Sequence, residues 1–230
     1  MAAGKRAQRM EQKRHDALKA AVALFLQQGY HATKLEQIAR AIDSSTASLL
    51  RAYADKEAIL HALMTELVEL QFETVRTMLR EDAEPILVYA LKSALQLTLC
   101  EQHEAQRDIY VAAYTLPTTS EFIYHANTAE LAQIVFEYMP ELLPSDIFEL
   151  EIAAGSMMRG YMSRRCDLYF PVERKCQLFL DCCMKIFEIP PQKREEVIAA
   201  VLGMDIDAMA KRISRIMGME LAGEPLPADA

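Results

Sequence analysis

The sequence predicts an all-α fold in which a small three-helix unit is joined by a long helix to a larger helical body. Three observations indicate this fold. Helix-forming residues such as Ala, Leu, Glu, Met and Lys dominate the 230 residues, and only 7 are Gly. Apolar residues recur at helical spacing along most of the chain. Prolines and short polar runs separate these stretches.

The composition is that of an ordinary globular protein, with 52% apolar and 25% charged residues. The apolar runs fall short of the roughly 18 residues that a membrane helix requires. The basic N-terminal stretch MAAGKRAQRM lacks the apolar core of an export signal. We therefore expect a cytoplasmic protein without a membrane anchor.

Charge is distributed unevenly along the chain. The net charge is −8, yet residues 1–56 contain ten Lys and Arg against five Asp and Glu. A basic N-terminal quarter on an acidic body suits a protein that binds a polyanion at one end. A solvated charge run without function is the alternative interpretation.

The first helix is expected to follow a flexible arm. Residues 1–10 are basic, and their side chains could reach phosphates or a minor groove; disorder without function is the alternative. The helix itself is predicted from Glu11 to Gln28, with Gly29 as the residue that ends it. It should pack across the two helices that follow.

Residues 33–57, TKLEQIARAIDSSTASLLRAYADKE, organise the rest of the chain. Thr33, with Glu36 three residues later, fits a capping box at the start of a short helix. Asp43 tolerates the left-handed conformation that a tight turn requires, and the serines after it cap a second short helix from Thr46 to about Tyr53. This is the helix-turn-helix pattern, although two packed helices without a DNA function also produce it.

The outer face of the second short helix carries small hydroxyls and one arginine. Such side chains suit the major groove, where base edges require compact donors and acceptors. We expect base contacts from Thr46, Ser48 and Arg51, and phosphate contacts from Thr33, Lys34, Ser45 and Lys56.

The segment from Leu18 to Leu60 resembles the N-terminal domain of the TetR family of transcriptional regulators. The ungapped resemblance rests on Ala20-Ala21, Leu24-Phe25, Gly29-Tyr30, Thr33, Ile38-Ala39, Ser45, Leu49, Arg51, Tyr53 and Lys56-Glu57. It implies double-stranded DNA with a pseudo-palindromic operator as the partner. It also implies a homodimer and a small-molecule effector bound in the C-terminal domain.

Several positions depart from the family pattern. Asp43 replaces the turn glycine, and Leu50 and Ala52 replace two aromatic residues that in the family often contact DNA phosphates. Either the basic N-terminal arm supplies the missing phosphate contacts, or the protein binds DNA weakly or not at all. The second case would make it a protein-interaction module with a TetR-like fold.

The rest of the chain is predicted to be helical. A long helix should run from Lys56, which Asp55 can cap, to about Arg80. Further helices are expected at about 85–101, 104–115, 120–138, 145–165, 171–187 and 191–217, the last broken near Gly203. The expected domains are residues 1–55 for DNA binding, 56–217 for ligand binding and dimerisation, and 218–230 as a flexible tail.

The C-terminal domain holds most of the Met and aromatic residues. Met-rich walls adapt to varied ligands, although each such residue more often belongs to an ordinary core. The candidates for a ligand cavity with polar groups to orient the ligand are His103, Arg107, Tyr110, Tyr114, His125, Met158 and Tyr161.

The resemblance assigns dimerisation to the helices at about 145–165 and 171–187. Small residues at 153–155 and Gly160 permit close helix approach on the first, and the second is strongly apolar. An unpartnered apolar helix would leave a large patch on a monomer, so we expect a partner copy there.

No catalytic function is expected. The sequence has no Ser-His-Asp order, phosphate loop, nucleotide fingerprint or metal-ligand cluster, so we expect no enzyme activity, no cofactor and no metal. The five cysteines include no CxxC pair and are expected to be reduced and mostly buried, with redox sensing by Cys182 and Cys183 as the alternative. The favoured function is an effector-controlled regulator, with repression preferred over activation.

Overall fold

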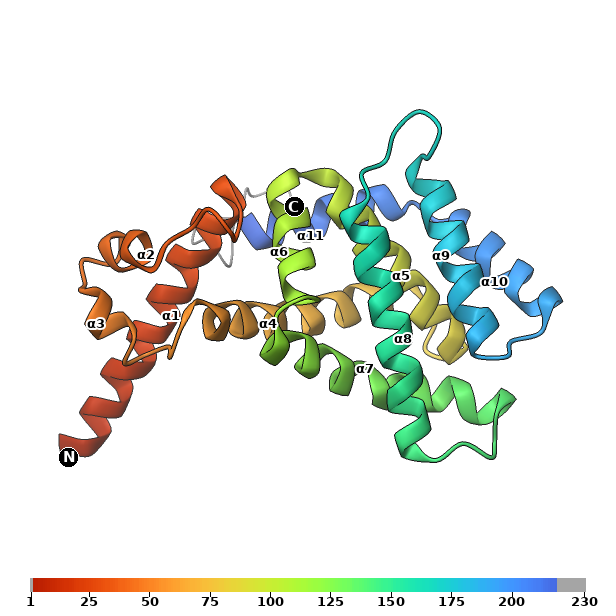
Figure 1. Ribbon diagram of the computed structural model, residues 1–230, viewed down its shortest axis with the longest axis horizontal. Coiled ribbons are helices and arrows are strands. Elements are labelled where there is room, and N and C mark those ends of the chain that lie inside the picture. Colours follow the sequence, from red (N-terminus) through yellow and green to blue (C-terminus); the bar gives the residue numbers. More distant parts are fainter. Residues whose placement is uncertain (1, 219–230) are drawn as a thin grey trace.

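The computed structural model describes residues 2–218, and within them eleven α-helices form the all-α fold that the sequence predicts (Figure 1). The helices are α1 (Ala2–Gln28), α2 (Leu35–Ala41), α3 (Thr46–Leu49), α4 (Lys56–Met78), α5 (Pro85–Gln102), α6 (Glu104–Ala113), α7 (Pro117–Tyr138), α8 (Pro144–Ser163), α9 (Val172–Ile186), α10 (Pro191–Leu202) and α11 (Ile206–Ile216). The expected tail lies outside the described residues from position 219 onward.

The first three helices form a compact unit at one end of the molecule (Figure 1). Phe25 of α1, Ile38 of α2 and Leu49 of α3 are fully buried and belong to its core. Gly29 ends α1 with a φ of +88°, a conformation that glycine adopts without steric cost. Asp43 has a φ of +47° in the turn between α2 and α3, as predicted.

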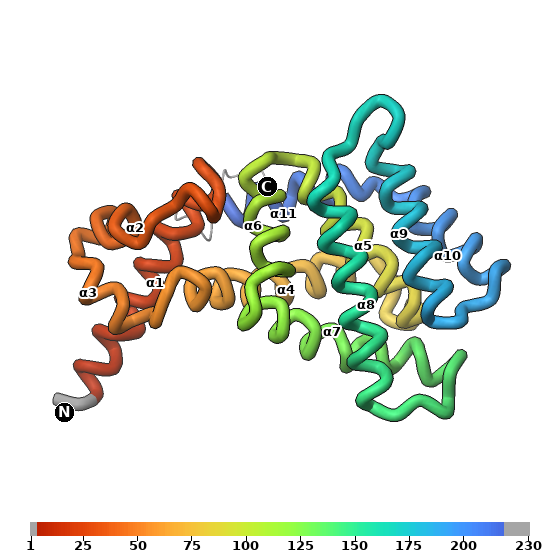
Figure 2. Tube along the Cα trace, in the orientation of Figure 1, coloured from red at the N-terminus to blue at the C-terminus, as the bar shows by residue number. Residues whose placement is uncertain are grey.

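The N-terminal segment differs from the prediction. α1 is continuous from Ala2 to Gln28, so the expected flexible arm at residues 1–10 is wrong for the described part of that segment. Ala, Gln, Arg, Lys and Met are all good helix formers, and no proline interrupts the run before Glu11. In Figure 2 this helix projects beyond the three-helix unit, on the side where α3 lies.

The start of α2 also corrects the prediction. Lys34 is the N-cap residue, and its backbone N–H donates to Gln37 Oε1 at 2.8 Å. Thr33 instead is buried, and its hydroxyl donates to Gly29 O at 2.7 Å. The predicted box between Thr33 and Glu36 is therefore wrong, because the Gln37 side chain accepts the Lys34 N–H one residue later.

The long helix α4 leads from the three-helix unit into the body. Asp55 caps it as predicted, since its Oδ1 accepts the Ala58 N–H at 2.8 Å. α5 lies at the centre of the body, and every residue from Tyr89 to Cys100 is buried. α4, α6, α7, α8, α9, α10 and α11 all pack against it.

Most helix boundaries agree with the sequence to within a few residues. Pro85, Pro117, Pro144 and Pro191 each occupy the first turn of a helix, where the missing N–H costs nothing. The predicted break near Gly203 separates α10 from α11. α3 is shorter than predicted and ends at Leu49, with turns from Leu50 to Tyr53.

Neither a helix suited to span a membrane nor a group of metal-binding side chains occurs within residues 2–218. No helix among them combines the length and the apolarity that a membrane span requires. No three His, Cys, Asp or Glu side chains in that range lie close enough together to hold a metal ion.

Candidate nucleic-acid interface and interior of the body

A side-chain cap and a buried leucine fix the orientation of the α3 face that is exposed to solvent. Ser45 is the N-cap residue, and its hydroxyl accepts the Ser48 N–H at 3.2 Å. Leu49 anchors the opposite face in the core. Thr46, Ala47 and Ser48 are therefore turned outward on a helix whose first turn is fixed.

α1 supplies cations to this face. Lys13 Nζ donates to Ser44 Oγ at 2.7 Å and also to Ser48 Oγ. Arg14 Nε donates to Ala52 O at 3.0 Å. Arg14 thus lies beside Ala52, one of the two positions where the resembling family has aromatic phosphate contacts, and Lys13 lies beside Ser44 and Ser48.

The two altered positions themselves differ in exposure. Leu50 is 41% exposed, whereas Ala52 is buried beneath Arg14. Lys5, Arg6 and Arg9 are exposed further along α1. Because α1 is a helix up to Ala2, Arg6 and Arg9 share a face with Lys13 at the spacing i, i+3 and i+7.

Of the three predicted base readers, Arg51 has the greatest freedom. Its side chain is exposed, and it makes no hydrogen bond or ion pair within residues 2–218. Ser48 is held by Lys13, so its hydroxyl is oriented before any ligand arrives. Thr46 is half-buried. A base contact by any of them stays a prediction.

The predicted phosphate contacts separate into two groups. Lys34 and Ser45 are exposed at the N-termini of α2 and α3, where backbone N–H groups favour anions. Thr33 is only 1% exposed and bonded to Gly29 O, so its side chain cannot reach a phosphate in this conformation. Lys56 Nζ donates to Tyr30 O and Thr33 O, both at 2.8 Å, so its first role is structural.

The environment of Lys56 agrees with that structural role. Its ammonium lies 4.2 Å from the centre of the Tyr30 ring. Burial lowers the pKa of Lys56, although Asp108 opposes the shift. Lys56 thus fastens the loop between α1 and α2 onto the start of α4.

Two sets of polar contacts join the body to the loop after α1 and to the first turn of α4. His31 N–H donates to Asp108 Oδ2 at 2.9 Å, and His31 Nδ1 lies 2.6 Å from Asp108 Oδ1. Glu57 Oε1 accepts the Thr118 and Thr119 N–H groups at 2.7 Å and 3.1 Å, and so caps the N-terminus of α7. α6 is therefore linked to the loop that follows α1, and α7 is linked to the start of α4.

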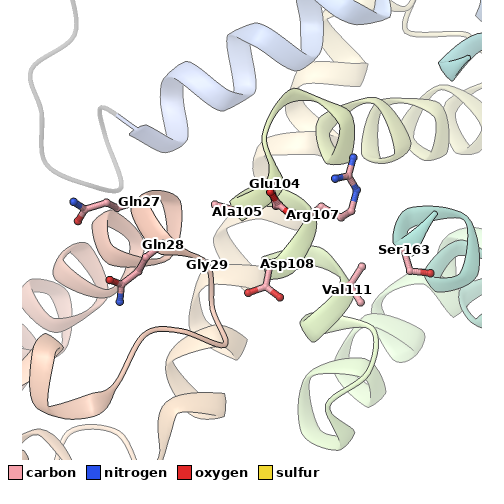
Figure 3. A pocket seen from close by; sticks show the side chains of 9 residues that line it. All are labelled: Gln27, Gln28, Gly29, Glu104, Ala105, Arg107, Asp108, Val111 and Ser163. Carbon is pink, nitrogen blue, oxygen red and sulfur yellow. The ribbon is translucent and has the colours of Figure 1, made fainter. Parts of the chain in front are cut away.

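An open cleft of about 520 Å³ lies beside the first of these contacts (Figure 3). The C-terminal end of α1, α6 and Ser163 of α8 line it. Arg107 lies at this cleft but is mostly buried, and its guanidinium donates to Glu101 Oε2 at 2.8 Å. This predicted ligand residue is already engaged by a carboxylate.

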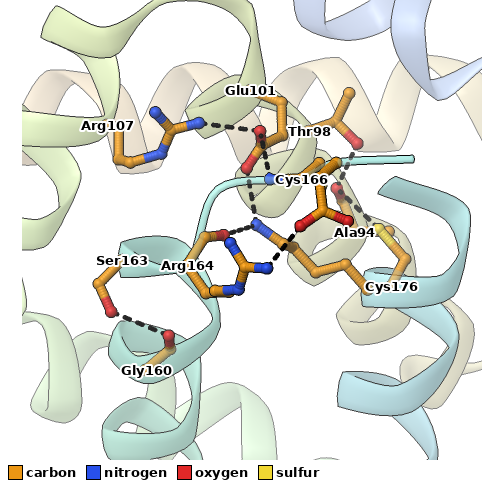
Figure 4. Close-up of polar contacts among 11 residues, drawn as sticks. Ala94, Thr98, Glu101, Arg107, Gly160, Ser163, Arg164, Cys166 and Cys176 are labelled. Carbon is orange, nitrogen blue, oxygen red and sulfur yellow. Dashed lines mark hydrogen bonds and ion pairs between the residues drawn. The ribbon is translucent and has the colours of Figure 1, made fainter. Parts of the chain in front are cut away.

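Glu101 is the centre of a polar cluster that fastens the α8–α9 connection to the body (Figure 4). The fully buried Lys175 contributes its Nζ, 2.6 Å from Glu101 Oε1, and the Cys166 N–H donates to Oε2 at 3.1 Å. Burial raises the pKa of Glu101, but hydrogen bonds from Lys175, Cys166 and Arg107 outweigh it and hold the pKa below its usual value.

The other predicted ligand residues lie in different parts of the body, some in its interior and some near its surface. Tyr110, Tyr114 and Met158 are buried in the body, where Tyr114 and Met158 line one small internal void. His103 is exposed before α6. His125 is exposed and pairs with Glu121 at 3.1 Å, and Tyr161 packs edge-on against Phe179. The structure therefore does not bring His103, His125 and Tyr161 to the void.

Sequence reasoning missed the polar interior that surrounds Tyr114. The Tyr114 hydroxyl donates to Gln96 Oε1 at 3.2 Å, and Gln96 Nε2 donates to Gln71 Oε1 at 2.9 Å. The Tyr110 hydroxyl accepts from Gln71 Nε2 at 2.7 Å. The available signal was a set of polar residues at helix-core positions of α4 and α5.

The sequence analysis also did not predict a group of charged side chains in the interior of the body. Lys92 on α5 pairs with Glu130 on α7 and donates to Asn127 Oδ1 at 3.1 Å. Asn127 Nδ2 donates to Glu151 Oε1 of α8 at 2.8 Å. Burial raises the pKa of Glu151 to about 7, while Asn127 and Lys92 oppose the shift. The one sign of this group in the sequence was Lys92, a charged residue within the apolar stretch ILVYALKSALQLTL.

The predicted dimer helices exist as α8 and α9, but the reason given for pairing α9 is wrong. Phe179, Met184 and Phe187 are fully buried within the chain itself, because α9 packs on α5, α8 and α10. The exposed apolar residues of this region lie elsewhere. Leu168 and Tyr169, 87% and 91% exposed, lie in the loop before α9, and Ile152 lies on α8.

The cysteines are free thiols among the residues that the structure describes. Cys100, Cys176 and Cys183 are buried, and Cys166 and Cys182 are partly exposed. Burial raises the pKa of Cys100 and of Cys176 to about 12. Both thiols are therefore protonated and poorly reactive near neutral pH.

The three-helix unit has helix-turn-helix geometry, because a tight turn that contains Asp43 joins α2 to α3. Residues 17–63 match the model of the family described as "Bacterial regulatory proteins, tetR family". The matched segment covers α1 from Ala17 to the first turns of α4, and it is similar to the N-terminal domain of that family.

Curated relatives agree with this assignment. The HTH-type transcriptional regulator RutR of Escherichia coli (strain K12) is 33% identical over 105 residues, which are 46% of each chain. The HTH-type transcriptional regulator HbdR of Aromatoleum sp. (strain CIB) is 30% identical over 107 residues, 46% of this chain and 44% of HbdR. The matched part thus spans less than half the length of these relatives. Both are named as regulators and not as enzymes, in line with the sequence-based expectation.

A solved structure described as a gamma-butyrolactone receptor (ArpA like protein) has 17% sequence identity and a TM-score of 0.46. That comparison covers 90% of this chain and 98% of the receptor chain.

Proposed function

We propose that this protein is a homodimeric transcriptional repressor that binds a pseudo-palindromic operator and releases it when a small molecule enters the body. The supporting observation is the connection between the two ends of the molecule. α6 contacts His31 in the loop between α1 and α2, and α7 contacts Glu57 in the first turn of α4, directly after the three-helix unit.

DNA recognition is proposed to use α3 and the basic face of α1. Arg51 is exposed and unpaired within residues 2–218, and Lys13 brings a positive charge to Ser44 and Ser48. Arg is the side chain best suited to bidentate contact with guanine in the major groove. Lys13, Arg9 and Arg6 continue the positive face toward the flanking phosphates.

Control by a small molecule is proposed to act through α7. Glu57, in the first turn of α4, caps the N-terminus of α7, while Asn127 and Glu130 further along α7 face the polar interior. A ligand that displaces α7 would also displace Glu57, which caps it. The start of α4 would then move relative to the helix-turn-helix unit that precedes it. The coupling is reciprocal, so DNA and ligand weaken each other's binding by the same factor.

Dimerisation is proposed to use the outer face of α8 and the loop before α9. Ile152, Ala153 and Gly160 are exposed on α8, and Leu168 and Tyr169 project from the loop. A two-fold axis there would present two α3 helices to successive major grooves, about one DNA turn or ~34 Å apart.

The test is a selection of duplex DNA by the purified protein, followed by affinity measurements on the selected site and on random DNA. Arg51→Ala should weaken the selected site by about tenfold or more and random DNA much less, since a bidentate base contact is worth about 1–3 kcal/mol. Arg40→Ala is the matched control, because Arg40 is an exposed arginine on α2. Equal weakening of both duplexes by Arg51→Ala would make Arg51 a phosphate contact and refute its base-reading role.

The second candidate function is a protein-interaction module. It rests on the exposed Leu50 and the buried Ala52 at positions where the resembling family has aromatic phosphate contacts. The discriminating result is the absence of any gel shift with upstream DNA, combined with a reproducible protein partner.

A further inference from the structure

The exposed face of α8 carries two charges of opposite sign, one in each half of the helix. Glu149 and Arg159 are both exposed, and neither makes a hydrogen bond or ion pair with another residue in the range 2–218. Ile152 and Ser156 lie between them at helical spacing and are also exposed, so all four side chains lie on one side of the helix.

The two charges lie at equal distances from the middle of α8. Glu149 and Arg159 are each five residues from Ala154, which is about 7.5 Å along the helix axis. If a second α8 packs antiparallel and crosses the first at its middle, Glu149 of each copy faces Arg159 of the other. Packed helix axes are about 8–10 Å apart, a distance that these two long side chains span together. A parallel arrangement would instead bring like charges together.

Apolar side chains are exposed beyond both ends of the same helix. Leu143, before the first residue of α8, is 63% exposed, and Leu168 and Tyr169, in the loop that follows α8, are 87% and 91% exposed. Figure 2 shows that the connection before α8 and the loop after it lie at opposite edges of the body. The antiparallel arrangement therefore brings the apolar loop of each copy to the apolar N-terminal end of α8 in the other.

The loop after α8 has an ordered conformation within the single chain. Asp167 Oδ1 accepts the Tyr169 and Phe170 N–H groups, both at 2.9 Å, and the backbones of Asp167 and Phe170 pair at 3.2 Å. The Cys166 N–H donates to Glu101 Oε2 and fastens the start of the loop to the body. A loop that is already ordered loses little conformational entropy when a partner docks on it.

We propose that a second copy of this chain covers α8 in antiparallel orientation, and that two Glu149–Arg159 pairs across the two-fold axis decide which chains pair. Leu168 and Tyr169 of each copy then lie against Leu143 of the other. This inference rests on the proposed function, because it specifies the interface of the proposed homodimer. A chain that lacks this charge pattern is rejected, since its α8 places like charges or unpaired charges at these positions.

The experiment measures the dissociation constant of the dimer by analytical ultracentrifugation of the full chain at low salt. Glu149→Arg places two arginines opposite each other, and Arg159→Glu does the same with two glutamates. Each variant alone should dimerise about tenfold or more weakly than the original chain, because like charges at an interface repel. Glu195→Arg on α10 and Arg212→Glu on α11 are matched controls at exposed positions, and both should leave the dissociation constant unchanged.

An equimolar mixture of Glu149→Arg and Arg159→Glu provides the decisive result. In the mixed dimer every arginine again faces a glutamate, so the mixture should dimerise about as tightly as the original chain. The double variant with both changes should do so on its own. A folding defect does not recover on mixing. Unchanged dimerisation of the single variants, or a loss that neither the mixture nor the double variant recovers, overturns the proposal.

The same measurements separate this inference from the proposed function. A dimer that none of the charge changes weakens would keep the proposed homodimer and refute the pairing through α8. A chain that remains monomeric at every concentration would refute both. Recovery of the dimer by the charge exchange, without any DNA sequence selected by the protein, would confirm the pairing and refute the repressor function.

Discussion

The buried carboxyl of Glu151 makes a quantitative prediction about stability. Glu151 is 2% exposed, and burial raises its pKa from the ordinary 4.5 to about 7. A carboxyl whose pKa is higher in the folded than in the unfolded state binds its proton more tightly when folded. Its contribution to stability is therefore greatest below about pH 4.5 and falls as the pH rises to 7.

The size of the effect follows from the two pKa values. Their difference corresponds to about 3 kcal/mol of stability lost between acidic and neutral pH. Glu151→Gln removes the titration but keeps an oxygen that can accept from Asn127. We therefore expect the variant to gain up to about 3 kcal/mol over the original chain at pH 8, and much less at pH 5.

The assay is urea unfolding of both proteins at pH 5, 6, 7 and 8. The difference between them isolates Glu151, because Lys92 and Glu130, the charged groups that face it, are present in both. A gain of about 3 kcal/mol corresponds to a melting temperature roughly 6–12 °C higher for a chain of this size. A difference that does not change with pH, or one that is larger at pH 5 than at pH 8, would refute the reasoning.

Two further predictions concern the three-helix unit. Gly29→Ala should destabilise the protein by about 1–3 kcal/mol, since φ is +88° and a Cβ there would lie 2.7 Å from Asp108 Oδ2. Thermal melts check this against Gly4→Ala, where a Cβ meets nothing within 4 Å; equal effects of both changes would contradict it. Lys13→Ala should weaken binding to all duplexes alike and reduce the slope of log affinity against log salt by about 1. Anisotropy titrations across salt concentrations measure that slope, and an unchanged slope would exclude Lys13 from the interface.

The sequence predicted those features of the fold that depend on a few neighbouring residues. Gly29 adopts a left-handed conformation because it has no Cβ, and Asp43 does so because its short polar side chain tolerates it. Asp55 accepts an N–H only three residues away. The cap at Thr33 was wrong because two adjacent residues compete to begin α2. Sequence spacing alone does not decide between them.

The errors in the body have a common cause in long-range packing. The apolar α9 was expected to require a second copy, but α5, α8 and α10 of the same chain cover Phe179 and Phe187. The candidate ligand residues were chosen by type, whereas the polar interior joins Lys92, Asn127 and Glu151 from three different helices. Lys92 in an apolar stretch was visible in the sequence, but its partners 35 or more positions away were not.

The most direct test of the central claim is the position of α3 on DNA. Ala47 is exposed on α3 between Thr46 and Ser48, so a photo-crosslinking amino acid placed there should lie in the major groove. We expect covalent adducts to bases within the selected operator and none when the same amino acid replaces His125, which is exposed on α7 of the body. Specific DNA binding with no adduct from position 47, or with equal adducts from both positions, would contradict it.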